Sequence, residues 1–200
     1  MQNILLFAQT SDLESKFLGT SILDKFIKDF KKNANLKIYS KFDSVRKTIP
    51  EDLLIAETDY EKAIEEYRKN VDNFFIITKL AVSNIDYEKV LAYHINHSKD
   101  CTIVLRNLIR GKTTPIYKLN EKRDVLTINK KRYTNCGVYL FNGNVDFKNC
   151  PTISAKIVEL MEDDNLKGFV HAGYFNIEPS NNIKGFKKVR RKYIGGKNNG

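Results

Sequence analysis

Two histidines in this 200-residue chain have a type and a spacing that suggest chemistry. His94 and His97 are three positions apart, a spacing that on a helix could bring two imidazoles to one metal ion. No cysteine or carboxylate cluster completes a ligand set, so we interpret them as a solvated pair at a helix end. His171 is a lone histidine near an expected strand, where packing is the simpler role.

Two carboxylates lie where α/β sheets usually bind ligands. Asp86 and Glu88 follow the end of an expected strand. The alternative is that they begin a helix and face water, which we favour because carboxylates stabilise helix N-termini. The chain has no Walker lysine loop, no glycine-rich dinucleotide loop and no Ser/His/Asp pattern. Residue types alone therefore predict a cytosolic α/β domain and do not name its chemistry.

The stretch from residue 72 to 105 organises the elements that would position these side chains. Runs of β-branched and aromatic residues predict buried strands over residues 74–77 and 101–105, and helical spacing predicts a helix over 87–94. A turn region opens at residues 78–80. This is a β-α-β unit, so a parallel sheet with helices on its faces is expected.

Further elements are expected on both sides of this unit. Toward the N-terminus we predict strands over residues 3–7 and 36–39, a polar loop over 8–20, helices over 21–30 and 59–70, and a short strand as one interpretation of 53–56. Thr20 or Ser21 and Asp59 are the expected helix caps. Toward the C-terminus we predict antiparallel strands over 115–119 and 124–129, a strand over 138–141, a helix over 154–161 and a last strand from Phe169. The predicted fold is α/β, with an antiparallel C-terminal portion.

Composition fits one globular domain over residues 1–183, with a basic tail over 184–200. The chain is 42% hydrophobic and 29% charged, and no apolar run approaches the roughly 20 residues that span a bilayer. Much of the net charge of +10 comes from the tail, which could bind RNA, an acidic partner or a membrane surface, or could simply be a solvated end. Three widely spaced cysteines, Cys101, Cys136 and Cys150, are expected to be buried free thiols in a reducing, cytoplasmic setting.

Several segments, in order along the chain, resemble the sugar-phosphate nucleotidyltransferases. Residues 72–84 (DNFFIITKLAVSN) resemble the central segment of that family, and residues 87–105 resemble its next helix, loop and strand. Residues 135–141 (NCGVYLF) resemble its Asn-Ala-Gly-Ile-Tyr strand, and residues 151–175 follow the order of its C-terminal part. The resemblance covers about residues 1–188 and is closest to mannose-1-phosphate guanylyltransferase, with glucose-1-phosphate adenylyltransferase next.

The resemblance implies a Rossmann-like mixed sheet of the GT-A-like type. It also implies an Mg²⁺-dependent reaction that joins a nucleoside triphosphate to a sugar 1-phosphate and releases pyrophosphate. The family's glycine-rich first loop is absent, because Phe7 is followed by AQTSDLESKF with no glycine before Gly19. The family's base-reading Gly-Thr-Ala-Gly segment falls on residues 59–63, and its metal-binding aspartate falls on Leu80. Leucine cannot ligate Mg²⁺, which requires oxygen.

Some family positions survive as candidates. Lys16 and Lys130 are candidate phosphate contacts, and Asn135 and Gly137 match residues that face the sugar in the family. The alternatives are solvated lysines for the first two, and a turn with a close-packed strand for the others. The weak metal candidates are Asn176, Glu178 and Asp86.

The function that these observations favour is a catalytically degraded nucleotidyltransferase that acts as a binding or regulatory subunit. Such a subunit would bind a sugar nucleotide, a catalytic homologue or a larger complex. Two alternatives stay open. One is an active enzyme that uses Mg²⁺ and makes an NDP-sugar. The other is a subunit of the eukaryotic initiation-factor exchange complex, whose nucleotidyltransferase-like branch residues 82–86 also resemble.

Overall fold

A computed structural model describes residues 1–17, 19–69, 71–107, 116–119, 125–128, 133–173 and 175–176. Within these residues no helix is long and apolar enough to cross a bilayer. The basic tail, Lys130 and Glu178 lie outside the described residues.

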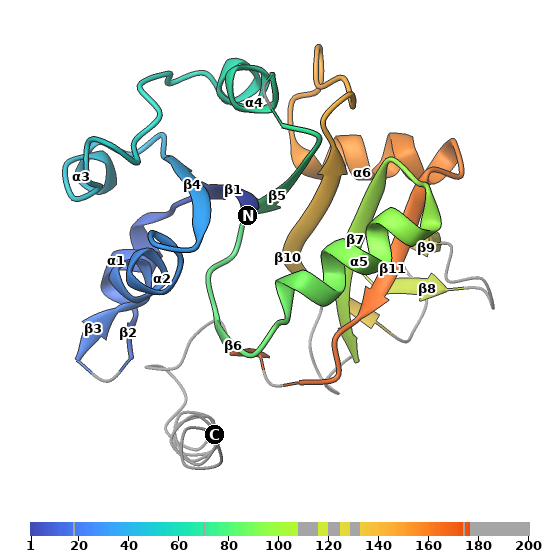
Figure 1. Ribbon diagram of the computed structural model, residues 1–200, viewed down its shortest axis with the longest axis horizontal. Coiled ribbons are helices and arrows are strands. Elements are labelled where there is room, and N and C mark those ends of the chain that lie inside the picture. Colours follow the sequence, from blue (N-terminus) through green and yellow to red (C-terminus); the bar gives the residue numbers. More distant parts are fainter. Residues whose placement is uncertain are drawn as a thin grey trace.

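A mixed sheet forms the centre of the molecule, with the strand order β11-β7-β10-β5-β1-β4 (Figure 1). These strands are β1 (Gln2–Phe7), β4 (Ala34–Tyr39), β5 (Asn73–Ile77), β7 (Cys101–Asn107), β10 (Tyr133–Asn142) and β11 (Leu166–Val170). β1 pairs in parallel with β4 and β5, and β11 pairs in parallel with β7, whereas β10 is antiparallel to both of its neighbours. The predicted α/β class with a mixed sheet is therefore confirmed.

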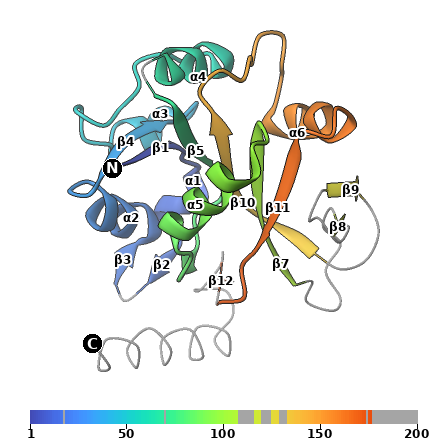
Figure 2. The ribbon, with the colours of Figure 1, turned by 45° about the vertical axis from the view of Figure 1, so that its right-hand side comes forward.

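Two further strands extend this sheet, and two separate two-stranded sheets accompany it in the described part of the chain. β8 (Ile116–Leu119) and β9 (Val125–Ile128) form the predicted antiparallel pair, and β8 also pairs with β10. Figure 2 shows this pair beside β7 and β11, away from β1 and β4. The separate sheets are β2 (Lys16–Phe17) with β3 (Thr20–Ser21), and β6 (Val82–Ser83) with β12 (Phe175–Asn176).

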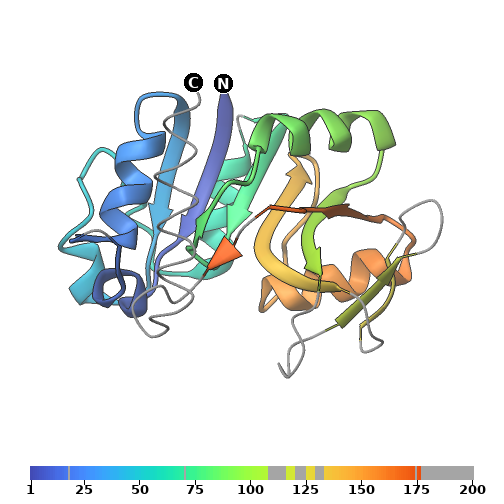
Figure 3. The same cartoon turned by 90° about the horizontal axis from the view of Figure 1, so that it is seen from below.

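Helices cover both faces of the sheet because its strands are apolar on both sides. The helices are α1 (Thr10–Glu14), α2 (Ile22–Phe30), α3 (Asp43–Arg46), α4 (Tyr60–Arg68), α5 (Tyr87–His97) and α6 (Ile153–Glu162). α4 and α6 pack on the face that contains Phe74 and Phe141, and α2 and α5 pack on the face that contains Phe75 and Leu140. Figure 3 shows α5 and α6 on opposite sides of the sheet. The result is a three-layer α/β/α arrangement.

Capping residues in the sequence predicted where α2 and α4 begin. Ser21 caps α2 by accepting a hydrogen bond from the backbone of Asp24 at 3.0 Å, and Asp59 caps α4 by accepting one from Lys62 at 2.9 Å. Asp59 was the predicted cap of its helix and Ser21 was one of two candidates with Thr20, because a short polar side chain before an amphipathic run satisfies free amides at a helix start. The three cysteines are buried and free, as expected.

Two predictions about the chain path need correction. Residues 8–20 are not only a polar loop, since they contain α1 and the β2–β3 hairpin. The central β-α-β unit is formed by β5, α5 and β7, but these strands are not neighbours because β10 lies between them. Strand pairing of this kind depends on contacts between distant segments, which local periodicity does not report.

His94 is not solvated, contrary to the sequence interpretation. It is only 2% exposed, its Nδ1 lies 2.9 Å from Thr102 Oγ1 and its Nε2 lies 2.8 Å from Asn142 Oδ1. An amide oxygen can only accept, so Nε2 carries the proton and Nδ1 accepts from the threonine hydroxyl. His97 instead stacks on Tyr93 with ring centroids 4.0 Å apart.

We expect His94→Ala to lower the free energy of unfolding by about 2–4 kcal/mol at pH 7.5, because two buried polar groups lose their partner. Burial lowers the pKa of the His94 imidazole, so the unfolded chain takes up this proton first and the native state loses stability as pH falls. The difference in unfolding free energy between the native protein and His94→Ala should therefore become smaller from pH 7.5 to pH 5. Urea unfolding at both pH values measures this difference. His97→Ala is the control and should lower the unfolding free energy less than His94→Ala does. An equal difference in unfolding free energy at both pH values would contradict the lowered pKa of His94.

Candidate functional site

A cavity of about 410 Å³ lies at the C-terminal ends of β1, β4 and β5. Open α/β sheets bind ligands at this edge, where loops from neighbouring strands converge. Phe7, Tyr39 and Thr78 are the last residues of these strands or the first beyond one, and all three line the cavity. The volume is within the range of pockets for small organic ligands.

Aromatic side chains form much of the cavity wall. The Phe7 ring packs between Tyr39 and Tyr60, with ring centroids 5.1 and 5.2 Å away. Tyr139, from β10, also lines the cavity. The Tyr39 hydroxyl donates to the Thr58 carbonyl at 2.8 Å, which fixes its ring. Such walls offer flat, apolar faces to a planar ligand.

Polar groups complete the cavity at three points. Gln9 follows β1, Lys41 follows β4, and the start of α6 contributes Thr152 and Ser154. Thr152 caps α6 by accepting from the Ala155 backbone at 3.1 Å, so the helix begins at the cavity. These groups can position a ligand that carries hydrogen-bonding atoms or negative charge around an aromatic core.

Tyr60 sits at the junction of α4 and α6. Burial raises the pKa of its phenol well above the ordinary value, and the neighbouring Cys150 and Tyr139 add to this effect. The Tyr60 hydroxyl is buried without a hydrogen-bond partner among the described residues, and the backbone of Ile153 opposes the shift only in part. Tyr60 is therefore a neutral wall residue at physiological pH, and proton transfer is not a role that its environment supports.

The predicted candidates Asn135 and Gly137 lie together in a bulge of β10 that supports the cavity. Asn135 Oδ1 accepts from the Gly137 backbone at 2.6 Å, and its Nδ2 donates to the Tyr139 hydroxyl at 2.5 Å. Gly137 has φ +71°, and its carbonyl accepts from the Thr78 backbone at 2.8 Å. The bulge thus orients Thr78 and Tyr139, which line the cavity. Whether Asn135 or Gly137 contacts a sugar stays a prediction.

The loop after β1 is built around a carboxylate of the chain itself. It forms the short helix α1, and the backbone N–H of Gln9 donates to Asp12 Oδ2 at 2.7 Å. Asp12 is only 8% exposed, and burial raises the pKa of its carboxyl to about 6, although the bond from Gln9 opposes the shift. A glycine-rich phosphate loop would offer its free amides to the ligand. Here the chain's own anion takes the Gln9 amide.

The position that the resemblance assigns to a metal-binding aspartate does not fit a metal. Leu80 is 2% exposed and packs among apolar residues below the sheet edge. In the part of the chain that the structure describes, no group of three or more His, Cys, Asp or Glu side chains could hold an ion. Mg²⁺ requires oxygen ligands, so the buried Leu80 side chain does not fit this ion.

The remaining predicted residues are dispersed. Asp86 caps α5 by accepting a hydrogen bond from the Lys89 backbone at 3.1 Å. That bond lowers the pKa of the Asp86 carboxyl below its ordinary value. Lys16 is exposed on the β2–β3 hairpin and is not among the cavity-lining residues. Asn176 pairs with Val82 in the small β6–β12 sheet. As metal or phosphate contacts these residues stay predictions.

None of the residues that line the cavity was among the site candidates predicted from the sequence. Lys41 is the second residue after the predicted strand 36–39, and that position is a usable signal for a ligand contact. Tyr60 begins a predicted helix and Tyr139 lies in a predicted strand, so both were interpreted only as parts of elements. Lys41, Tyr60 and Tyr139 meet at one cavity only because of the strand order.

Comparison with known proteins identifies the class of fold. No protein-family model matches the sequence, and no curated protein matches it. Solved structures do match over nearly the whole chain. HddC from Yersinia pseudotuberculosis aligns with a TM-score of 0.64 at 14% identity, covering 96% of this chain and 100% of that one.

Two further structures have similar scores. A protein described as a glucose-1-phosphate thymidylyltransferase from Bacillus anthracis aligns with a TM-score of 0.65 at 10% identity, covering 94% of this chain and 93% of that one. CMP:2-keto-3-deoxy-manno-octonic acid synthetase, in a complex with CTP, aligns with a TM-score of 0.64 at 11% identity, covering 98% of this chain and 99% of that one. The chain therefore has a nucleotidyltransferase-like fold.

Proposed function

We propose that this chain is a nucleotide-binding protein that holds a nucleotide or sugar nucleotide in the aromatic cavity without transferring a nucleotidyl group. The observation that carries the proposal is the combination of an intact cavity at the strand ends with a buried leucine at the metal position. In this proposal the chain acts as a binding or regulatory subunit, together with a catalytic homologue or a larger complex.

The cavity supports a nucleobase as the part that is recognised. Phe7, Tyr39, Tyr60 and Tyr139 surround a space large enough for a nucleoside, and rings of this kind stack on bases or cover them edge-on. Gln9 can both donate to a base edge and accept from it. Three solved structures with a similar fold were determined with GMP-PN, sucrose or CTP, which agrees with a nucleotide or sugar as the ligand.

The loop after β1 argues against transfer chemistry. Transfer from a triphosphate needs charge neutralisation on several phosphate oxygens at once. Asp12 brings a negative charge to this loop, and Leu80 supplies no ligand for a divalent cation. Neither Asp12 nor Leu80 supplies the positive charge that transfer from a triphosphate requires, while the binding cavity is kept.

Calorimetric titration and thermal unfolding with GTP, ATP, CTP, GDP-mannose and other sugar nucleotides test the proposal, each with Mg²⁺ and with EDTA. A ligand at 100 times its Kd should raise Tm by about 5–10 °C in a chain of this size. No pyrophosphate should be released from a triphosphate and a sugar 1-phosphate. Release of pyrophosphate, or triphosphate binding that requires Mg²⁺, would overturn the proposal in favour of an active enzyme.

Ser154→Trp tests whether the cavity is the binding site. Ser154 is exposed at the start of α6 and lines the cavity, so an indole there should fill the space and weaken nucleotide binding at least 10-fold. Ser44→Trp, on exposed α3, is the matched control and should bind like the native protein. If both variants bind equally well, the ligand occupies another site.

A further inference from the structure

We propose that Lys79 and Arg106 form a phosphate-binding site at the C-terminal ends of β5 and β7 that works without a divalent cation. The ligand group would be a phosphate or diphosphate, held by fixed side-chain cations where the resemblance places a metal. The inference deepens the proposed function, since it concerns how the same ligand's charge is met.

The first observation is the place of Lys79 in the chain. It follows Thr78, which lines the cavity and is held by its backbone bond to Gly137, 2.8 Å from nitrogen to oxygen. The next residue, Leu80, returns to the core. Lys79 is exposed between these two anchored neighbours. Its backbone is therefore fixed at the border of the cavity while its side chain is available to a ligand.

The second observation is a platform under the Lys79 side chain. A Cβ placed on Gly137 would lie 2.7 Å from Lys79 Cβ, 2.8 Å from Cγ and 3.1 Å from Cδ. The aliphatic part of Lys79 thus lies directly against the glycine of the β10 bulge. Only a glycine leaves room for this contact, and the contact restricts the side chain before any ligand arrives. A restrained lysine loses less entropy on binding an anion.

The third observation is a second cation on β7, the strand on the other side of β10 from β5. Arg106 lies near the end of β7 and is paired across the ladder with Thr134 of β10. Both Arg106 and Lys79 act electrostatically on Cys136, which lies between Asn135 and Gly137 in the bulge. Burial still dominates and raises the pKa of that thiol to about 12, so Cys136 stays neutral. Lys79 packs on Gly137 and Arg106 is paired with Thr134, so the two cations lie on either side of β10 near its bulge, where the neutral thiol of Cys136 adds no negative charge.

The side chains of Leu80 and Lys79 do not fit a divalent cation at this position. Leu80 is buried and has no oxygen to offer, and a lysine ammonium beside it would repel a divalent cation. A phosphate, in contrast, is attracted by an ammonium and can accept two bonds from a guanidinium. The charges present at this edge fit the anion and not the metal.

Titration with pyrophosphate in EDTA is the direct test, because pyrophosphate needs no base-binding cavity. The native protein should bind it at least as tightly in EDTA as in Mg²⁺. Lys79→Met keeps the packing on Gly137 and removes the charge, so it should weaken binding at least about 10-fold. Lys79→Arg should bind within a few-fold of the native protein. Lys47→Met, at an exposed lysine after α3, is the matched control and should bind like the native protein.

GDP and mannose 1-phosphate identify the source of the phosphate. Tighter binding of GDP than of pyrophosphate assigns the site to a nucleotide, and tighter binding of mannose 1-phosphate assigns it to a sugar phosphate. No pyrophosphate binding, Mg²⁺-dependent binding, or unchanged binding by Lys79→Met would each overturn the inference. Guanosine binding that Ser154→Trp abolishes would then still support the proposed function. Pyrophosphate binding without any nucleoside binding would support the inference and count against the cavity.

Discussion

Replacement of Gly143 by alanine should lower the free energy of unfolding by more than about 3 kcal/mol. A Cβ at this position would lie 1.9 Å from the Val71 carbonyl oxygen, and 3.0 Å from its carbon. Both atoms belong to the backbone, so relief requires the chain after β10 to move. Such a movement would break the bond from the Gly143 N–H to the Asp72 carbonyl, which is 2.6 Å long.

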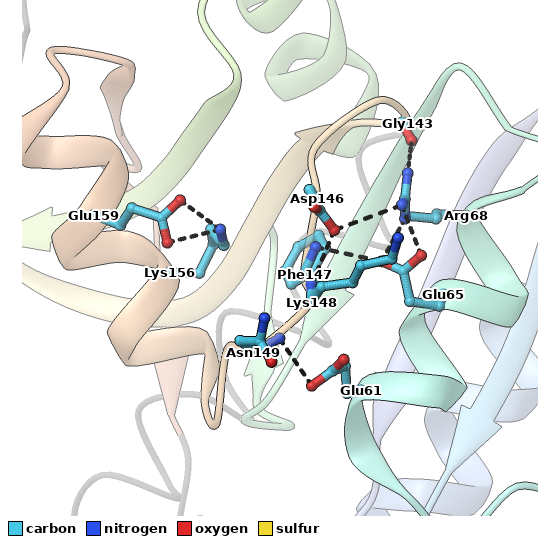
Figure 4. A network of polar contacts seen from close by, with 10 residues as sticks. All are labelled: Glu61, Glu65, Arg68, Gly143, Asp146, Phe147, Lys148, Asn149, Lys156 and Glu159. Carbon is cyan, nitrogen blue, oxygen red and sulfur yellow. Dashed lines mark hydrogen bonds and ion pairs between the residues drawn. The ribbon is translucent and has the colours of Figure 1, made fainter.

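The segment that would move is held against α4 by a network of charged groups (Figure 4). Arg68 donates to the Gly143 carbonyl at 3.1 Å and forms two bonds of 2.7 and 2.6 Å with Glu65. Glu65 accepts from the Phe147 backbone at 3.3 Å, and Glu61 accepts from the Asn149 backbone at 3.1 Å. This segment leads into α6, whose start lines the cavity, so the substitution should also weaken ligand binding.

Urea unfolding of Gly143→Ala measures the loss. Gly19→Ala is the control, because Gly19 has φ +85° but nothing within 4 Å of the added Cβ. It should lose only about 1 kcal/mol, which is the cost of a left-handed backbone for alanine. If Gly143→Ala loses no more than Gly19→Ala, the close approach to Val71 is not a constraint in solution.

Replacement of Asp12 by asparagine should stabilise the protein above pH 6.5 by about 2–3 kcal/mol. Burial raises the pKa of the Asp12 carboxyl to about 6, against 3.8 for an ordinary aspartate. Between these values the native state holds the proton and the unfolded state does not, so stability falls as pH rises from about 4 to 6. Asparagine never ionises, and its amide oxygen can still accept from Gln9.

The difference in unfolding free energy between Asp12→Asn and the native protein should therefore be near zero at pH 4 and reach its full value by pH 7. Guanidinium unfolding at four pH values follows it, and taking the difference cancels the titration of His94. Asp163→Asn, in the exposed turn after α6, is the matched control and should show no such pH-dependent gain. A difference that is flat with pH would show that Asp12 is not buried as a charged group.

The Asp12 variant also bears on function. A loop that places a destabilising carboxylate beside the amide of Gln9 is costly to keep, and natural proteins tolerate such strain mainly where it serves a role. Removal of the charge should make the loop less repulsive to phosphates. Asp12→Asn should therefore bind nucleotides at least as tightly as the native protein.

Local physics explains the elements that were predictable from the sequence. Asp59 was predicted as a cap, and Ser21 as one of two candidates with Thr20, because the chemistry of a helix start involves only residues three positions apart. The buried strands around Phe74 and Val138 were recognised because continuous apolar runs are typical of strands covered on both faces. The mixed α/β class followed from the order of these elements.

The residues that form the site were only partly predictable. The bulge residues Asn135 and Gly137 were singled out by resemblance, but their effect on Tyr139 depends on a β10 conformation that periodicity does not reveal. Nothing in the residue types around Asp12 signalled a buried carboxylate, since desolvation depends on the elements packed over it.

The sequence by itself determined the helix starts, the buried strands, the three buried thiols and a leucine at position 80, where the resemblance would place a metal ligand, because each depends on residue type and near neighbours. The tertiary structure alone decided what lies next to what. It placed β10 between β5 and β7, buried His94, and brought Lys41, Tyr60 and Tyr139 to one cavity. The physical reason is that strand order and burial arise from contacts between residues far apart in the chain, which no local pattern encodes.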